Sequence, residues 1–117
     1  MPVSRSLLPA SLLVILFAQP ANADTSATST ISQIKVIDVA DDTYQFFHGA
    51  VWLEHDKADH NYRWGGKHCG GVTLSESSIN LLFAAFRDKH SVAIDYRAYK
   101  YKTHVSRCIT AFTVTRT

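Results

Sequence analysis

The sequence lacks the short motifs that mark the common enzyme active sites. It has no Gly-x-Ser-x-Gly nucleophile elbow, no glycine-rich phosphate loop and no His-Glu-x-x-His metal pair. A cysteine nucleophile is disfavoured too, because Cys69 and Cys108 are expected to bond to each other. Glu54, Asp56 and Asp59 could act as paired carboxylates, but acids gathered in one polar loop are common in any protein. We therefore predict a non-enzyme without a cofactor.

The sequence also lacks a marked excess of one charge. It has 12 Lys and Arg against 10 Asp and Glu, and without residues 1–23 the basic residues are only one ahead. A general polyanion binder would be far more basic, so no nucleic-acid partner is expected. No apolar stretch after Phe17 is long enough to span a membrane, so no transmembrane segment is expected either.

Residues 1–23 are typical of a secretory signal peptide. Arg5 supplies a positive charge, residues 7–17 are mostly apolar, and Ala21-Asn22-Ala23 provides a small-x-small cleavage pattern. The apolar run is shorter than the roughly 20 residues that a membrane-spanning helix needs. We expect cleavage near Ala23 and a product that is secreted or periplasmic.

The remaining chain is short enough for one domain. Residues 24–30 are small and polar and predict a flexible leader, followed by a single domain over 31–117. An exported chain with two cysteines most simply pairs them, here Cys69 with Cys108. The loop this disulfide closes would stabilise the fold by about 4 kcal/mol on the chain-entropy model.

The pattern of apolar residues predicts three strands, one helix and two strands. Strands are expected over 31–39, 44–53, 91–98 and 106–116, with Gly49 marking a bulge or sharp bend. The segment 62–74 is expected to contain the third strand, broken by Gly65-Gly66 and Gly70-Gly71. The helix is expected over 74–89, with an apolar stripe formed by Ile79, Leu82, Phe83 and Phe86. Its start fits a capping box of Thr73 and Glu76, with Ser75 or Ser77 as alternative caps.

This order predicts an α+β, mostly β fold. A five-stranded Greek-key barrel with one amphipathic helix between its third and fourth strands is the layout of the OB-fold. We therefore predict an OB-like barrel, although other α+β folds share the same order of elements.

The second half of the chain resembles a known group of proteins. Its pattern comprises Cys69, the helix at 78–86, the strand at 91–96 and the segment 108–114. It resembles small secreted Gram-negative proteins with an LLxAA-type helix, and differs from them at 88–90, where they carry Ser-Gly-Lys. The layout is similar to the B subunits of AB-type toxins of the cholera and subtilase kind. The resemblance implies an OB-fold, binding of cell-surface glycans and a ring-shaped homo-oligomer.

The segment 96–107 is the main candidate for ligand binding. Aromatic rings alternate there with cations, and the candidates are Tyr96, Arg97, Tyr99, Lys100, Tyr101, Lys102 and Arg107. Tyrosine rings stack on sugars or bases, while Lys and Arg pair with carboxylate, sulfate or phosphate. The alternative is a solvated hairpin whose lysines protect a sheet edge. Trp64, together with Trp52, could add a sugar platform, but tryptophans are more often core residues in a small domain.

A histidine-rich loop is a weaker candidate, for a metal ion. His55, Asp59, His60 and His68 carry ligand types that zinc or copper accepts, but their spacing matches no standard site. An ordinary charged turn is the alternative. His48 is expected to be a hydrogen-bonded core histidine.

These observations favour an exported binding module that recognises a glycan or other anionic surface through the segment between the fourth and fifth strands. Two alternatives stay open. The first is a structural or accessory subunit of an envelope or secreted assembly, with a protein as its partner. The second is a histidine-rich metal-binding protein.

Overall fold

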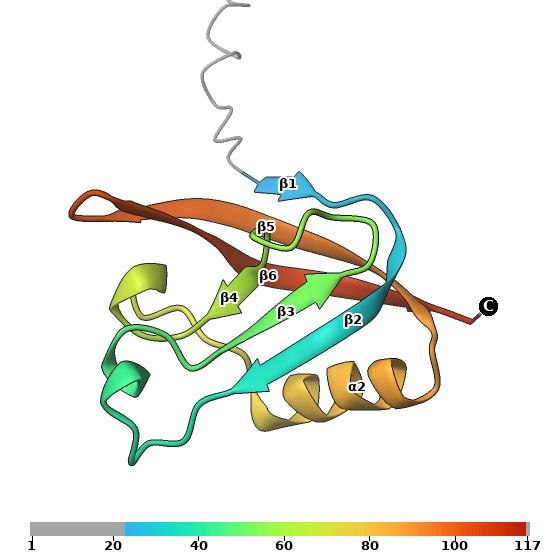
Figure 1. Ribbon diagram of the computed structural model, residues 1–117, viewed down its shortest axis with the longest axis horizontal. Coiled ribbons are helices and arrows are strands. Elements are labelled where there is room, and N and C mark those ends of the chain that lie inside the picture. Colours follow the sequence, from blue (N-terminus) through green and yellow to red (C-terminus); the bar gives the residue numbers. More distant parts are fainter. Residues whose placement is uncertain (1–22, 117) are drawn as a thin grey trace, which may run out of the picture.

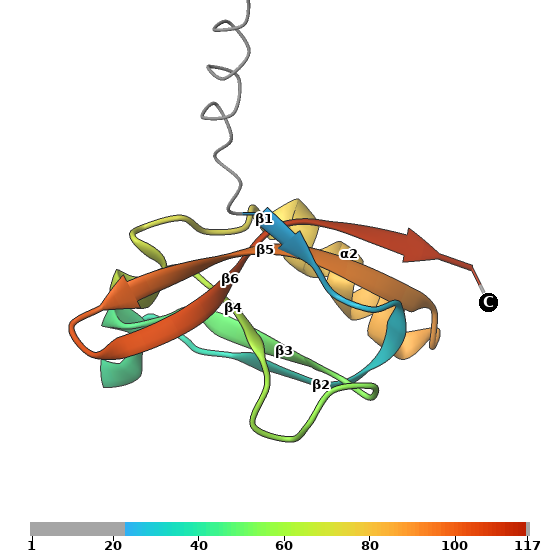
Figure 2. The same cartoon turned by 90° about the horizontal axis from the view of Figure 1, so that it is seen from above.

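The computed structural model describes residues 23–116 and arranges them as a sheet with one α-helix (Figures 1 and 2). The strands are β1 (Ala23–Thr25), β2 (Ser29–Val36), β3 (Gly49–Leu53), β4 (Tyr62–Trp64), β5 (Ser91–Tyr101) and β6 (His104–Thr115). The helix is α2 (Glu76–Arg87), and two 3-10 turns are η2 (Asp42–Gln45) and η3 (Lys67–Cys69). The predicted signal peptide, apart from Ala23, lies outside these residues. Within them, no helix has the length and apolar character needed to cross a membrane.

The strands form one mixed sheet of six, in the order β1-β5-β2-β3-β4-β6, and β5 also pairs with β6. Every pairing is antiparallel except that of β4 with β6, which runs parallel at Arg63 and Cys108. The longest pairing joins β5 to β6, from Ser91 opposite Thr115 to Tyr101 opposite His104. The predicted mostly β fold with one helix is confirmed, but the described residues hold six strands rather than five.

The extra strand changes the position of the helix in the order of elements. Four strands precede α2, whereas three were predicted. The difference arises in the predicted leader, 24–30, because Ala23–Thr25 pairs with β5 and Ser29 begins β2. Ser26 adds to this attachment, because its backbone N–H donates to the carbonyl of Ile94 at 2.8 Å. Backbone hydrogen bonds need no apolar side chains, so the polar composition of this segment did not reveal the strand.

One predicted strand is shorter than expected, and another ends at its predicted break. The segment predicted as 44–53 begins with η2, where the side chain of Asp41 accepts a hydrogen bond from the backbone of Thr43 at 2.8 Å. Within 62–74 the strand ends at Trp64, at the predicted break, because Gly65 and Gly66 have φ of 80° and 74°. Such positive values are incompatible with a regular strand.

The main core lies between the sheet and α2. Its most buried side chains, none more than 1% exposed, are those of Val51, Trp64, Leu82, Ala85, Val92, Ile94 and Ile109. Figure 1 shows α2 lying along β2, and the two elements are in contact. The helix begins after Ser75, whose hydroxyl accepts from the backbone of Ser78 at 3.1 Å. The cap is thus Ser75, one of the predicted alternatives.

The predicted apolar stripe of the helix is only partly buried. Leu82 is 1% exposed, but Phe83 and Phe86 are 42% and 39% exposed. The buried face is centred on Leu82 and Ala85, so it is rotated away from the two phenylalanines. Helical periodicity identifies an apolar side of a helix, whereas the shape of the sheet decides which part of that side is covered.

Gly49 has a packing role at the start of β3. A side chain at this position would overlap the indole of Trp64 and the carbonyl of Lys35. The absence of a Cβ thus allows Trp64 to reach the core. The bulge predicted at Gly49 does not occur there. In the pairing of β2 with β3, the register is irregular in β2, between Ile31 and Gln33.

Candidate functional site

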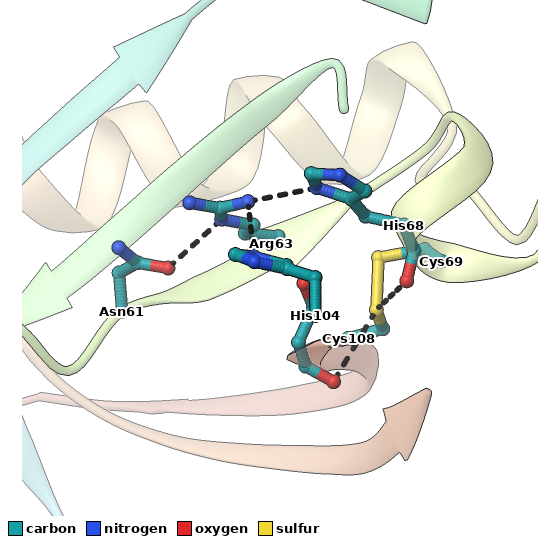
Figure 3. The surroundings of a disulfide bond; sticks show 7 residues. Asn61, Arg63, His68, Cys69, His104 and Cys108 are labelled. Atoms are coloured by element: carbon teal, nitrogen blue, oxygen red, sulfur yellow. Dashed lines mark hydrogen bonds between the residues drawn. A yellow bond between two sulfur atoms is a disulfide. The ribbon is translucent and has the colours of Figure 1, made fainter. Parts of the chain in front are cut away.

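The predicted disulfide joins Cys69 to Cys108 and anchors the candidate site. Both residues are fully buried, and their Cα atoms are 5.7 Å apart. The bond connects the end of η3 to β6, and the carbonyl oxygen of His68 lies 3.6 Å from the sulfur of Cys108 (Figure 3). The bridge therefore fixes His68 beside the strand that carries His104.

The segment 96–107 forms a hairpin, the shape given in the alternative interpretation of this segment. Strands β5 and β6 continue through it, and only Lys102 and Thr103 form the turn. Lys102 has φ of 57°, a left-handed conformation that a tight turn requires. The tip projects from the rest of the sheet, at the opposite end of the molecule from the last turn of α2 (Figures 1 and 2).

The hairpin register separates the predicted tyrosines and lysines onto two faces. Tyr99 and Tyr101 lie opposite Ser106 and His104, so these four side chains share one face. Lys100, between the two tyrosines, belongs to the other face. The alternating rings and cations therefore do not form one mixed surface, because strand side chains alternate in direction.

The tyrosine face leads into an aromatic cluster. Tyr99 and Tyr101 are half-buried, with Tyr99 beside Gly70. The Tyr101 ring lies 5.7 Å from that of His68 and 6.5 Å from that of Phe46. We call Tyr99 and Tyr101 the tyrosine face.

The other predicted ligand residues have different surroundings. Arg97, Lys100 and Lys102 are exposed. On the opposite face, the ring of Tyr62 contacts Tyr96 at 5.1 Å and the guanidinium of Arg107 at 5.3 Å. Trp64 is 1% exposed and belongs to the core, so it is not available to a ligand.

Beside the tyrosine face, Arg63 of β4 is held by contacts on several sides (Figure 3). Its guanidinium lies 3.9 Å from the centre of the Phe47 ring. Its Nε donates to Oδ1 of Asn61 at 3.2 Å. Its Nη1 lies 2.9 Å from Nδ1 of His68 and 3.4 Å from Nε2 of His104. We call Arg63, His68 and His104 the cationic cluster.

The hydrogen bonds of the cationic cluster define the protonation state of its histidines. Arginine can only donate, so each imidazole nitrogen that faces Arg63 must accept and carries no proton. Both rings are therefore neutral in this arrangement, and they stack with their centres 4.4 Å apart. Burial, the neighbouring His104 and the charge of Arg63 all lower the pKa of His68. Burial also lowers the pKa of Arg63.

Arg63 has no carboxylate partner in the described part of the chain. The ion pairs there join His60 to Asp59 and Arg87 to Asp88. A half-buried charge without a counter-ion is unfavourable, so this arginine is an unusual feature for a purely structural residue.

A small cleft of about 140 Å³ opens next to Arg63, between β6 and the segment that precedes β4. It is lined by Asp59, Asn61, Arg63, His104, Val105, Ser106 and Arg107. The hydroxyl of Ser106 is buried and has no hydrogen-bond partner among the described residues. Asp59, the cleft's one carboxylate, has a side chain that is 83% exposed. Two guanidinium groups and an imidazole therefore make the cleft suitable for an anion.

A wider cleft of about 500 Å³ lies between β2 and the loop after β3. Trp52 lines it, half-buried, and its Nε1 donates to the carbonyl of Ala58 at 3.0 Å. Of the two tryptophans considered as a sugar platform, Trp52 alone is partly accessible.

The metal candidates are not brought together. Among residues 23–116, no three His, Cys, Asp or Glu side chains are placed to share a metal ion. His60 instead pairs with Asp59 at 3.9 Å, and His68 contacts Arg63. His48 stacks on Tyr44, with ring centres 3.8 Å apart, and burial lowers its pKa.

Comparison with protein-family models, with curated proteins and with solved structures finds no match for this chain. A function must therefore be argued from the geometry of the site itself.

We expect the ligand-free protein to lose stability as the pH falls from 7 to 5. The folded pKa of His68 is below its ordinary value of 6.5, so in this range the unfolded chain binds more protons. His48 acts in the same direction, whereas the lowered pKa values of Asp41 and Asp88 matter only below about pH 4. Urea unfolding at both pH values tests this, and His68→Gln should reduce the difference. Equal stability at the two pH values would contradict it.

Proposed function

We propose that this chain is an exported, non-catalytic module that binds an acidic glycan on the tyrosine face and in the cleft beside it. The observation that carries the proposal is the half-buried Arg63 without a carboxylate partner among the described residues. The planar guanidinium matches a carboxylate or sulfate through two parallel hydrogen bonds. The half-buried rings of Tyr99 and Tyr101 offer apolar surface for the carbon face of a sugar.

We further propose that five of the strands form a closed OB-like barrel. The pairings support this, because they form a circuit from β2 through β3, β4, β6 and β5 back to β2. Proteins with this fold bind oligosaccharides beside the loop between their last two strands, which corresponds to the β5–β6 hairpin.

The proposed location is outside the cytoplasm, secreted or periplasmic. The disulfide between Cys69 and Cys108 supports it, because such bonds persist in oxidising compartments. The ring-shaped homo-oligomer implied by the resemblance to toxin subunits stays a prediction, which a mass measurement in solution would test.

Binding to a glycan array tests the proposed function. We expect signals from sugars that carry carboxylate or sulfate, and at least tenfold weaker binding for the double variant Tyr99→Ala and Tyr101→Ala, equivalent to about 1.4 kcal/mol. Phe83→Ala is a matched control, because it removes a partly exposed ring from α2, away from the hairpin. An array without signals, together with a co-purifying protein, would instead favour the accessory-subunit alternative.

A further inference from the structure

We propose that the cationic cluster is a proton-coupled anion site: it takes up about one proton with each carboxylate or sulfate that it binds, so acidic ligands bind more tightly as the pH falls below 7. The choice of ligand rests on the proposed function. The coupling itself follows from the geometry of Arg63, His68 and His104 and can be tested with inorganic sulfate.

Without a ligand, Arg63 can donate hydrogen bonds to both histidines only while their imidazoles are neutral. Nη1 of Arg63 carries two hydrogens, and two imidazole nitrogens lie within reach of them, at 2.9 Å on His68 and 3.4 Å on His104. A proton on either nitrogen turns an acceptor into a donor that faces another donor. Protonation therefore removes a hydrogen bond and adds a second positive charge beside the guanidinium.

The groups around the two imidazoles cannot balance that charge. His68 is packed against the rings of Phe46, Phe47 and Tyr101. Four further charged groups belong to these surroundings. Lys67 and Lys102 lie over the rings of Phe46 and Tyr101, and Asp59 and Arg107 line the cleft. Three of these four are cations, and the carboxylate of Asp59 is largely in water.

A bound anion makes protonation of an imidazole in the cluster favourable. Its oxygens can accept hydrogen bonds from Arg63 and from the new imidazolium N–H, and its charge offsets the added proton. Carboxylates of ordinary acidity and sulfates stay ionised between pH 5 and 7, so only the protein titrates in this range. Linkage is reciprocal, so the anion must raise the pKa of the imidazole by as much as the proton strengthens anion binding. For one coupled proton the affinity changes at most about tenfold per pH unit.

Calorimetric titration of the full chain with sodium sulfate at pH 7.5, 6.5 and 5.5, at constant ionic strength, tests the inference. We expect sulfate to bind at least tenfold more tightly at pH 5.5 than at pH 7.5. In two buffers of different ionisation enthalpy, proton uptake should approach one per sulfate. In parallel, NMR of the imidazole resonances should show that sulfate raises the pKa of His68 relative to chloride.

Two variants and one control locate the coupling. His68→Gln and His104→Gln keep an oxygen that can accept from Arg63 but cannot titrate, so each should reduce the pH dependence of sulfate binding. His55→Gln removes an exposed histidine that does not line the cleft and should keep the wild-type dependence.

The inference is overturned if sulfate does not bind at any of these pH values, if it binds equally at all of them, or if both glutamine variants keep the full dependence. These outcomes are separate from the test of the proposed function. Proton-coupled sulfate binding with a silent glycan array would refute the glycan proposal alone, whereas glycan binding that does not change with pH would refute the coupling alone.

Discussion

Replacing Cys69 and Cys108 together with alanine should lower the free energy of unfolding by about 4 kcal/mol, from the loop-closure entropy of residues 39 apart. For a domain of this size that corresponds to a fall in melting temperature of roughly 20 °C. The effect should be large because the bridge connects η3, which follows a three-residue strand, to the long β6. Without it, His68 is held against β6 only by noncovalent contacts such as its stacking on His104 and its contact with Arg63.

Urea denaturation of the double-alanine variant measures this change. Wild-type protein treated with a reductant provides the comparison, because it keeps both sulfurs and loses only the bond. Both should also bind sulfate more weakly, since His68 is no longer held near His104. A loss below about 1 kcal/mol in both samples would mean that the bridge is not the main constraint on this part of the fold.

Replacing Arg63 with glutamine should weaken binding of an acidic glycan or of sulfate by about 2–3 kcal/mol, which is roughly 30- to 150-fold. The reason is the loss of two charge-assisted hydrogen bonds to the anion. Stability should change little. The variant loses the stacking of the guanidinium on Phe47 and the hydrogen bonds from Arg63 to Asn61 and the two histidines, but it also removes a half-buried, unpaired charge. If Arg63 had only a structural role, the substitution would lower stability and leave the affinity for the anion unchanged.

Calorimetric titration of the variant beside wild type tests this expectation. Arg87→Gln is the matched control, because it removes the same charge from the last turn of α2, at the opposite end of the molecule from the hairpin tip (Figure 1). Arg63→Lys should bind with intermediate affinity, since it keeps the charge and loses the planar fork. Unchanged affinity in Arg63→Gln would show that Arg63 does not bind the anion, and would contradict the proposed function.

Part of the fold could be predicted from the sequence because it depends on local rules. The apolar spacing of Ile79 and Leu82, with a serine ahead of them, predicts the helix and one of its possible caps. The alternation of Val92, Ile94 and Tyr96 predicts the strand that becomes β5. The disulfide was also predictable, since two cysteines allow only one pairing.

Other parts could not be predicted because they depend on pairing between distant segments. The strand at Ala23–Thr25 exists only because β5 offers it a backbone edge. The burial of Trp64 requires the space that Gly49 leaves on the neighbouring strand. Neither contact between distant segments produces a periodic pattern of apolar residues in the sequence.

The proposed site combines residues that the sequence singled out with residues that it did not. The tyrosines of the hairpin were predicted as ligand residues, whereas neither Arg63 nor His104 was among the candidates. Arg63 and His104 are 41 residues apart, and the parallel pairing of β4 with β6 brings their strands together.

The sequence by itself determined the local elements and the single possible disulfide, because helix periodicity, strand alternation and cysteine pairing depend on residue type and order. The tertiary structure alone decided which side chains meet. It placed the tyrosines and Lys100 on opposite faces of the hairpin, and it assembled Arg63, His68 and His104 from β4, η3 and β6. Contacts of this kind depend on the register between strands, which hydrogen bonds and core packing set together and which no single segment encodes.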